Sequence, residues 1–74
     1  MTLVEIAKIY TDLVKAENKI PEEEYHAKDQ INALRTKYHQ LLMEKMRQEG
    51  IHFSDRFDAT NKAFEFIRQN SKAL

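Results

Sequence analysis

The sequence predicts an all-α fold of three helices, with a long helix between two short ones. The 74 residues include only one Gly and one Pro. Hairpins and loops depend on such turn residues, so few of them are expected. The chain is instead rich in Ala, Leu, Glu, Lys, Gln, Arg and Met, which lose little entropy in a helix. In each segment the apolar residues recur at alternating spacings of three and four, which places them on one helical face. These three observations leave little room for β-structure.

The first helix is expected over residues 3–18 of a single helical domain that spans residues 1–74. Thr2 and Glu5 match a capping box, in which each side chain accepts a hydrogen bond from a backbone N–H at the helix start. The apolar face consists of Ile6, Ile9, Leu13, Ala16 and Ile20, together with Leu3, Tyr10 and Val14. We place the end near residue 18, because the residue before Pro21 disfavours α geometry.

The second helix is expected over residues 21–49. Pro21 suits the first helical position, where its missing N–H costs nothing, and the Glu residues at 22–24 suit the positive end of the helix dipole. The residues predicted to lie in the core or in an interface are Ile31, Leu34, Tyr38, Leu41, Leu42 and Met46. Gly50 is expected to be the left-handed residue after the helix, with Ile51 returning to Met46 in a Schellman motif.

The third helix is expected over residues 55–70. Ser54 or Asp55 is a suitable N-cap. Phe57 and Phe64 are predicted to lie in the core or in an interface. They belong to an apolar stripe that also includes Phe53, Thr60, Ile67, Ser71 and Leu74. Residues 70–74 are expected to fray, as chain ends commonly do.

The helix lengths predict an assembly of two chains. At 1.5 Å per residue the middle helix is about 42 Å long and each flanking helix about 24 Å. Short connections fold both flanking helices back along the middle one, so they would lie nearly end to end and leave a layer two helices thick. Because such a layer buries apolar residues poorly, we expect a homodimer in which the long helices pair. The alternative is a compact monomeric three-helix bundle whose second helix is bent or frayed.

The sequence contains only weak candidates for chemistry. Glu23 and His26 form an E-x-x-H pattern, which holds metals in some helical bundles, but the apolar stripe of the second helix points away from His26. The other histidines, His39 and His52, are isolated in the sequence, and the absence of Cys excludes disulfides and thiolate zinc sites. We therefore expect no catalytic residue, no metal and no cofactor, and we do not expect an enzyme.

The charge pattern does not favour nucleic acid as a partner. The 12 basic residues balance 12 acidic ones to a net charge of +0, and the two kinds are interleaved instead of forming a basic stripe. The sequence contains no run of about 18 apolar residues, so no membrane helix is predicted. The first residues do not resemble a signal peptide. We therefore expect a cytoplasmic protein. The sequence pattern as a whole is typical of small helical proteins of bacteria and their phages.

The sequence favours a small non-enzymatic protein-interaction module, an adaptor, inhibitor or regulator that acts through a helical surface. Its protein partner cannot be identified from the residues. Two alternatives stay open, namely a DNA-binding or transcription-linked regulator and a metal-binding helical bundle that uses Glu23 and His26.

Overall fold

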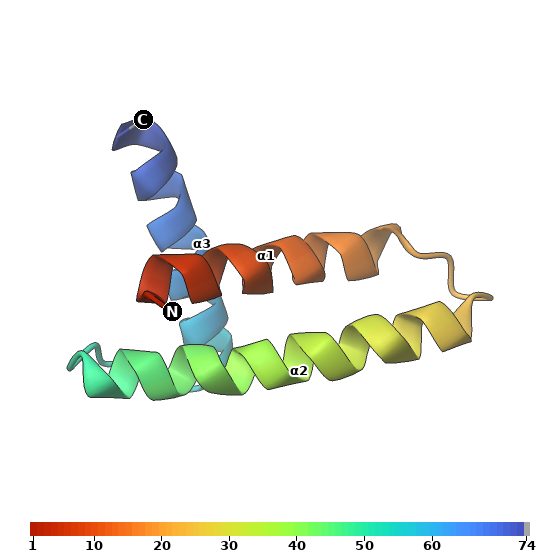
Figure 1. Ribbon diagram of the computed structural model, residues 1–74, viewed down its shortest axis with the longest axis horizontal. Coiled ribbons are helices and arrows are strands. Elements are labelled where there is room, and N and C mark those ends of the chain that lie inside the picture. The colour runs from red at the N-terminus through yellow and green to blue at the C-terminus, as the bar shows by residue number, and fades with distance from the viewer. Residues whose placement is uncertain (74) are drawn as a thin grey trace.

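The protein is all-helical, as predicted. The computed structural model describes the backbone of residues 1–73 and the side chains of residues 1–70. Over that range it contains three helices and no strand: α1 (Leu3–Lys19), α2 (Tyr25–Gln48) and α3 (Arg56–Ala73). α1 and α2 run antiparallel, and α3 crosses behind them at a steep angle (Figure 1). Of the predicted apolar stripe, Leu74 and the side chain of Ser71 lie outside the described residues.

The start of α1 confirms the predicted capping box. The backbone N–H of Thr2 donates to Glu5 Oε1 at 2.9 Å, and the backbone N–H of Glu5 donates to Thr2 Oγ1 at 3.1 Å. Both groups would otherwise be unsatisfied donors of the first turn. α1 ends one residue later than predicted, at Lys19, and Ile20 then adopts the extended geometry that precedes a proline.

The predicted start of the second helix at Pro21 was wrong. Pro21 begins a turn, which is closed by a 3.0 Å hydrogen bond from the N–H of Glu24 to the Pro21 carbonyl, and α2 begins at Tyr25. A helix that began at Pro21 would leave one residue, Ile20, to join two antiparallel helices, whereas such connections need at least two. The Glu residues at 22–24 therefore precede the helix instead of forming its first turn.

The end of α2 has the geometry of the predicted Schellman motif. Gly50 has a φ of +71°, in the left-handed region. Its N–H donates to the Arg47 carbonyl at 3.1 Å, and the N–H of Ile51 donates to the Met46 carbonyl at 2.8 Å. Ile51 also packs against the core cluster that contains Met46. The helix has 24 residues, which makes it about 36 Å long.

Asp55 caps the start of α3. Its carboxylate accepts from the N–H of Asp58 at 2.8 Å, and the Asp58 carboxylate accepts from the N–H of Ser54 at 2.9 Å. The two carboxylates thus satisfy backbone donors on either side of the helix start. α3 continues to Ala73, three residues beyond the predicted end.

The three helices share one core at one end of the molecule. The buried residues are Leu3, Ile6, Ala7, Tyr10 and Thr11 from α1, Leu42 and Met46 from α2, and Ala59 and Ala63 from α3. They come from the first half of α1, the last turns of α2 and the first half of α3. The other half of the α1–α2 pair, toward the connecting turn, extends beyond this core (Figure 1).

The expected end-to-end arrangement of the flanking helices was wrong. α3 crosses α1 and contacts it more extensively than it contacts α2. Ala7, Ala59 and Ala63 are completely buried, and such small side chains let helix backbones approach closely where they cross. The result is a three-helix core at one end, so the chain is two helices thick over only part of its length.

The predicted core positions differ widely in their exposure. Leu42 and Met46 have no exposed surface, and Tyr38 and Leu41 are half-buried against the same cluster. Ile31 and Phe64 are also half-buried. Leu34 is 45% exposed and Phe57 is 71% exposed, so these two residues do not belong to the core. Their position in an interface stays a prediction.

Candidate interaction site

A hydrogen-bonded polar cluster joins the three helices beside the core. His39 Nε2 lies 3.1 Å from the Arg56 carbonyl oxygen, and Thr60 Oγ1 lies 3.1 Å from the same oxygen. Because a carbonyl only accepts, His39 carries its proton on Nε2 and the Thr60 hydroxyl donates. The Tyr10 hydroxyl, 2.9 Å from Thr60 Oγ1, therefore donates to Thr60. The Tyr10 and His39 rings also stack, with centroids 5.2 Å apart.

Burial in this cluster lowers the pKa of His39. Loss of hydration lowers the pKa of His39, and the positive charges of Arg56 and Arg35 lower it further, while the bond to the Arg56 carbonyl acts in the opposite direction.

Acidification from pH 7 to pH 5.5 is expected to destabilise the protein through His39. Because its folded pKa lies below the unfolded value, its contribution is present above the unfolded pKa of about 6.5 and is lost as the pH falls through the folded pKa. The Glu5, Glu22 and Asp58 carboxylates, whose pKa values are also lowered, lose their contributions at more acidic pH. Thermal unfolding at both pH values measures the effect.

His39→Gln is the matched variant for this measurement, because the Gln amide can still donate a hydrogen bond but does not titrate. The melting temperature of His39→Gln should change less between pH 7 and pH 5.5 than that of the parent. Equal changes in the two proteins would contradict the role of His39.

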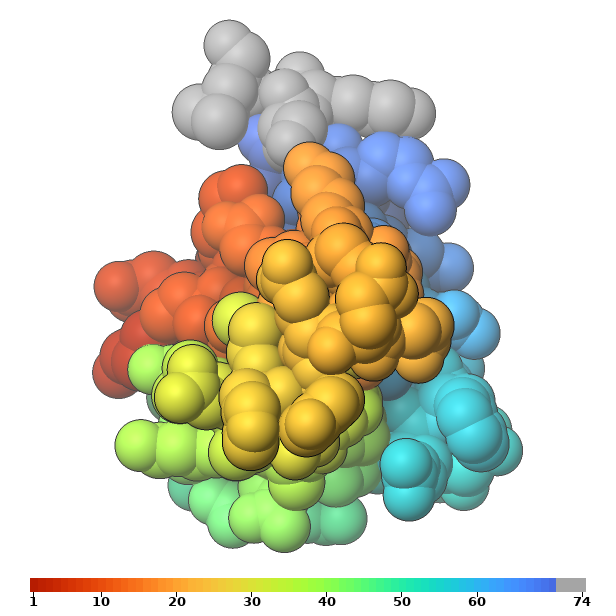
Figure 2. All heavy atoms as spheres, turned by 90° about the vertical axis from the view of Figure 1, so that its right-hand side faces the viewer, coloured from red at the N-terminus to blue at the C-terminus, as the bar shows by residue number. Residues whose placement is uncertain are grey.

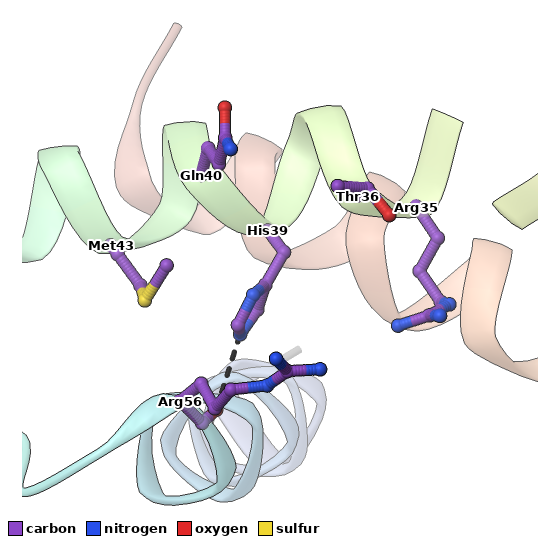
Figure 3. A pocket seen from close by; sticks show the side chains of 6 residues that line it. All are labelled: Arg35, Thr36, His39, Gln40, Met43 and Arg56. Atoms are coloured by element: carbon purple, nitrogen blue, oxygen red, sulfur yellow. Dashed lines mark hydrogen bonds between the residues drawn. The ribbon is translucent and has the colours of Figure 1, made fainter. Parts of the chain in front are cut away.

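Two arginines line a hollow next to this cluster, between α2 and the start of α3. Its lining consists of Arg35, Thr36, His39, Gln40, Met43 and Arg56, and its volume is about 180 Å³. The guanidinium groups of Arg35 and Arg56 extend from different helices into the space between them, with His39 at the centre (Figure 3). Among the described residues, no carboxylate lines this hollow.

The two arginines have different partners. Arg35 Nε donates to Glu17 Oε2 at 2.8 Å, which ties α2 to α1 and raises the pKa of Arg35. Arg56 has no carboxylate within 4 Å among the side chains of residues 1–70, and its guanidinium lies 5.6 Å from the centroid of the Phe57 ring. One cation is therefore fixed by an ion pair, and the other rests on an aromatic face.

A second hollow shares Arg35 with the first. It lies between α1 and α3, has a volume of about 240 Å³, and is lined by Tyr10, Val14, Glu17, Asn18, Arg35, Phe57 and Thr60. We call the two hollows together the Arg35–Phe57 groove. Phe57 is the most exposed large apolar residue in the described part of the chain. Seen from the turn between α1 and α2, the start of α3 (cyan) lies at the surface beside this helix pair (Figure 2).

The metal candidates do not form a site. Glu23 lies in the turn before α2 and His26 lies in its first turn, so the two residues do not share a helix as the E-x-x-H pattern of a metal site requires. Both are exposed, and the His26 ring contacts the ring of Tyr25. Among the described residues no group of three or more His, Asp or Glu could hold a metal ion.

Sequence reasoning missed the groove. It treated Arg35 and Arg56 as members of interleaved charge patterns and His39 as isolated, because Arg35 and His39, one turn apart on α2, are far along the chain from Arg56. The exposed Phe57 was assigned to the core or an interface on its spacing alone. Only the crossing of α3 over the other two helices brings the four residues together.

The fold and the groove define a small three-helix domain with a cationic and aromatic surface. Comparisons with protein-family models, with characterised proteins and with solved structures found no match for this chain. Within the described residues, no helix combines the length and the apolar character needed to cross a membrane.

Proposed function

We propose that this protein is a non-enzymatic protein-interaction module, an adaptor, inhibitor or regulator, that binds a protein partner through the Arg35–Phe57 groove. The main support for this proposal is the exposure of the Phe57 side chain. Burying a Phe side chain contributes about 1.5–3 kcal/mol, and this one is left 71% exposed although a core lies nearby. Aromatic residues and Arg dominate the binding energy of protein interfaces, and Arg56 lies directly over the Phe57 ring.

The proposal predicts that Phe57→Ala weakens partner binding without unfolding the protein. Tagged parent, Phe57→Ala and Leu34→Ala proteins would be used to capture partners from the source lysate, and binding of the recovered partner would then be measured by calorimetry. Phe57→Ala should weaken binding at least about tenfold, or about 1.4 kcal/mol. Leu34→Ala, which removes an apolar side chain that is exposed outside the groove, should bind like the parent.

Thermal unfolding supplies the control for this experiment. Because Phe57 is mostly exposed, its truncation should leave the melting temperature close to that of the parent. A Phe57→Ala protein that melts like the parent and binds the same partner with unchanged affinity would exclude the groove as the interface.

The two alternative functions have weaker support. Asp55 caps the start of α3 and Asp58 lies in its first turn, and these carboxylates would repel the phosphates of DNA. Tight binding to DNA needs several phosphate contacts, whereas the groove offers two arginines. For a metal-binding bundle, Glu23 and His26 are exposed and lie on different elements.

We also propose that the protein forms a homodimer in the cytoplasm. Its accessible surface of 5300 Å² exceeds the roughly 4,800 Å² expected of a compact protein of 8.8 kDa. Ile9 and Leu13 of α1, and Ile20 directly after it, are only half-buried, and among the described residues they do not pack against the core cluster. A second copy on this part of the α1–α2 pair would cover them. Light scattering after size-exclusion chromatography tests the proposal, and a mass of one chain at micromolar concentration would refute it.

A further inference from the structure

The chemistry of the Arg35–Phe57 groove indicates what kind of partner it binds. We infer that the partner segment is acidic: a carboxylate of the partner binds between Arg35 and Arg56, and a neighbouring apolar side chain packs against Phe57. This inference rests on the proposed function, because it assumes that a protein partner occupies the groove.

The first hollow is suited to a carboxylate. In the part of the chain that the structure describes, its lining contains two guanidinium groups, the polar side chains of Thr36 and Gln40, and no acidic residue. The bond from Arg35 to Glu17 uses Nε, so its two terminal amino groups remain for a second acceptor in the hollow. A planar guanidinium binds a carboxylate through two parallel hydrogen bonds, and it loses little entropy when it is already held in place.

Arg56 supplies the second cation without a competing carboxylate. It has no ion-pair partner among the described side chains, and its guanidinium lies over the Phe57 ring, 5.6 Å from the centroid. A carboxylate that binds both arginines would therefore balance a local excess of positive charge on a chain whose net charge is zero. Complementary charges of this kind favour the correct partner and speed its association.

The second hollow accounts for the apolar neighbour. It shares Arg35 with the first hollow, and Val14, Tyr10 and the exposed Phe57 contribute apolar surface to it. A peptide that alternates acidic and aliphatic residues can place a carboxylate in one hollow and a side chain in the other. Nucleic acid fits less well, because two cations provide few phosphate contacts and Asp55 and Asp58 lie at the start of α3.

The test is an NMR titration of the full chain with a defined probe, the peptide acetyl-Glu-Leu-Glu-Glu-Leu-Glu-amide. Saturable shifts are expected for the Arg35 and Arg56 Nε–H signals and for the backbone around His39 and Phe57. The same peptide with Gln in place of each Glu should bind at least about tenfold more weakly. No saturable shift up to about 5 mM of the acidic peptide would overturn the inference.

A matched pair of variants isolates the contribution of Arg56. Arg47 also stacks on a Phe ring, that of Phe53 at 5.4 Å, but it does not line the groove. Arg56→Gln should weaken peptide binding at least about tenfold, whereas Arg47→Gln should bind within about twofold of the parent. Equal affinities for the two variants would overturn the inference, as would tighter, salt-sensitive binding of an oligothymidylate of eight nucleotides.

Comparison with Phe57→Ala separates this inference from the proposed function. A natural partner that is lost in Phe57→Ala but retained in Arg56→Gln would support the groove as an interface and refute the acidic partner. If Phe57→Ala and Arg56→Gln both retain the partner, the proposed function itself fails.

Discussion

Leu42→Ala is expected to lower the free energy of unfolding by about 2–5 kcal/mol. Leu42 has no exposed surface and lies in the core that all three helices share. Its truncation removes apolar contacts and leaves a cavity that this small core cannot easily fill. Because a domain of this size has only a few kcal/mol of stability, the variant should be partly unfolded at room temperature. Urea unfolding followed by circular dichroism measures the loss.

Leu34→Ala is the control on the same helix. Leu34 is 45% exposed, so the same truncation should cost less than about 1 kcal/mol. If Leu42→Ala does not fold at all, Leu42→Val removes less volume and keeps the comparison measurable. Equal losses at positions 34 and 42 would contradict the location of the core.

Gly50→Val is expected to cost about 1–3 kcal/mol, because a β-branched residue is strained in the left-handed region. Gly50 has a φ of +71°, and a Cβ built on it would meet no atom within 4 Å. The expected cost therefore comes from the backbone conformation and not from a clash. Urea unfolding of the variant measures it directly.

Gly50→Asn separates backbone strain from other effects of a side chain. Asn tolerates the left-handed region better than other residues with a Cβ, so this variant should lose clearly less stability than Gly50→Val. If Val and Asn prove equally destabilising, the Schellman end of α2 does not depend on the left-handed conformation.

The sequence predicted helix ends wherever neighbouring residues determine them. Thr2 and Glu5 form their capping box across three residues. At the end of α2, Gly50 donates to the residue three positions before it and Ile51 donates to the residue five positions before it. The start of α2 was predicted wrongly because the local preference of Pro21 allows both a first helical position and a turn. The need to reverse the chain direction after α1 decided in favour of the turn.

Burial was less predictable than helicity. The stripe in the second helix correctly identifies an apolar face, yet Leu42 is completely buried whereas Leu34 is exposed. The two positions differ in which part of α2 the third helix reaches. Helical spacing cannot supply this information, because it describes one helix in isolation.

By itself, the sequence determined that this protein is all-helical, has three helices, begins the first with the Thr2–Glu5 capping box and ends the second at Gly50. Those features depend on interactions between residues three to five apart. Only the tertiary structure decided that α3 crosses α1 over small alanines, and that Arg35, His39, Arg56 and Phe57 meet in one groove. The physical reason is that a helix crossing depends on how closely packed surfaces fit, and this fit involves side chains far apart in the sequence.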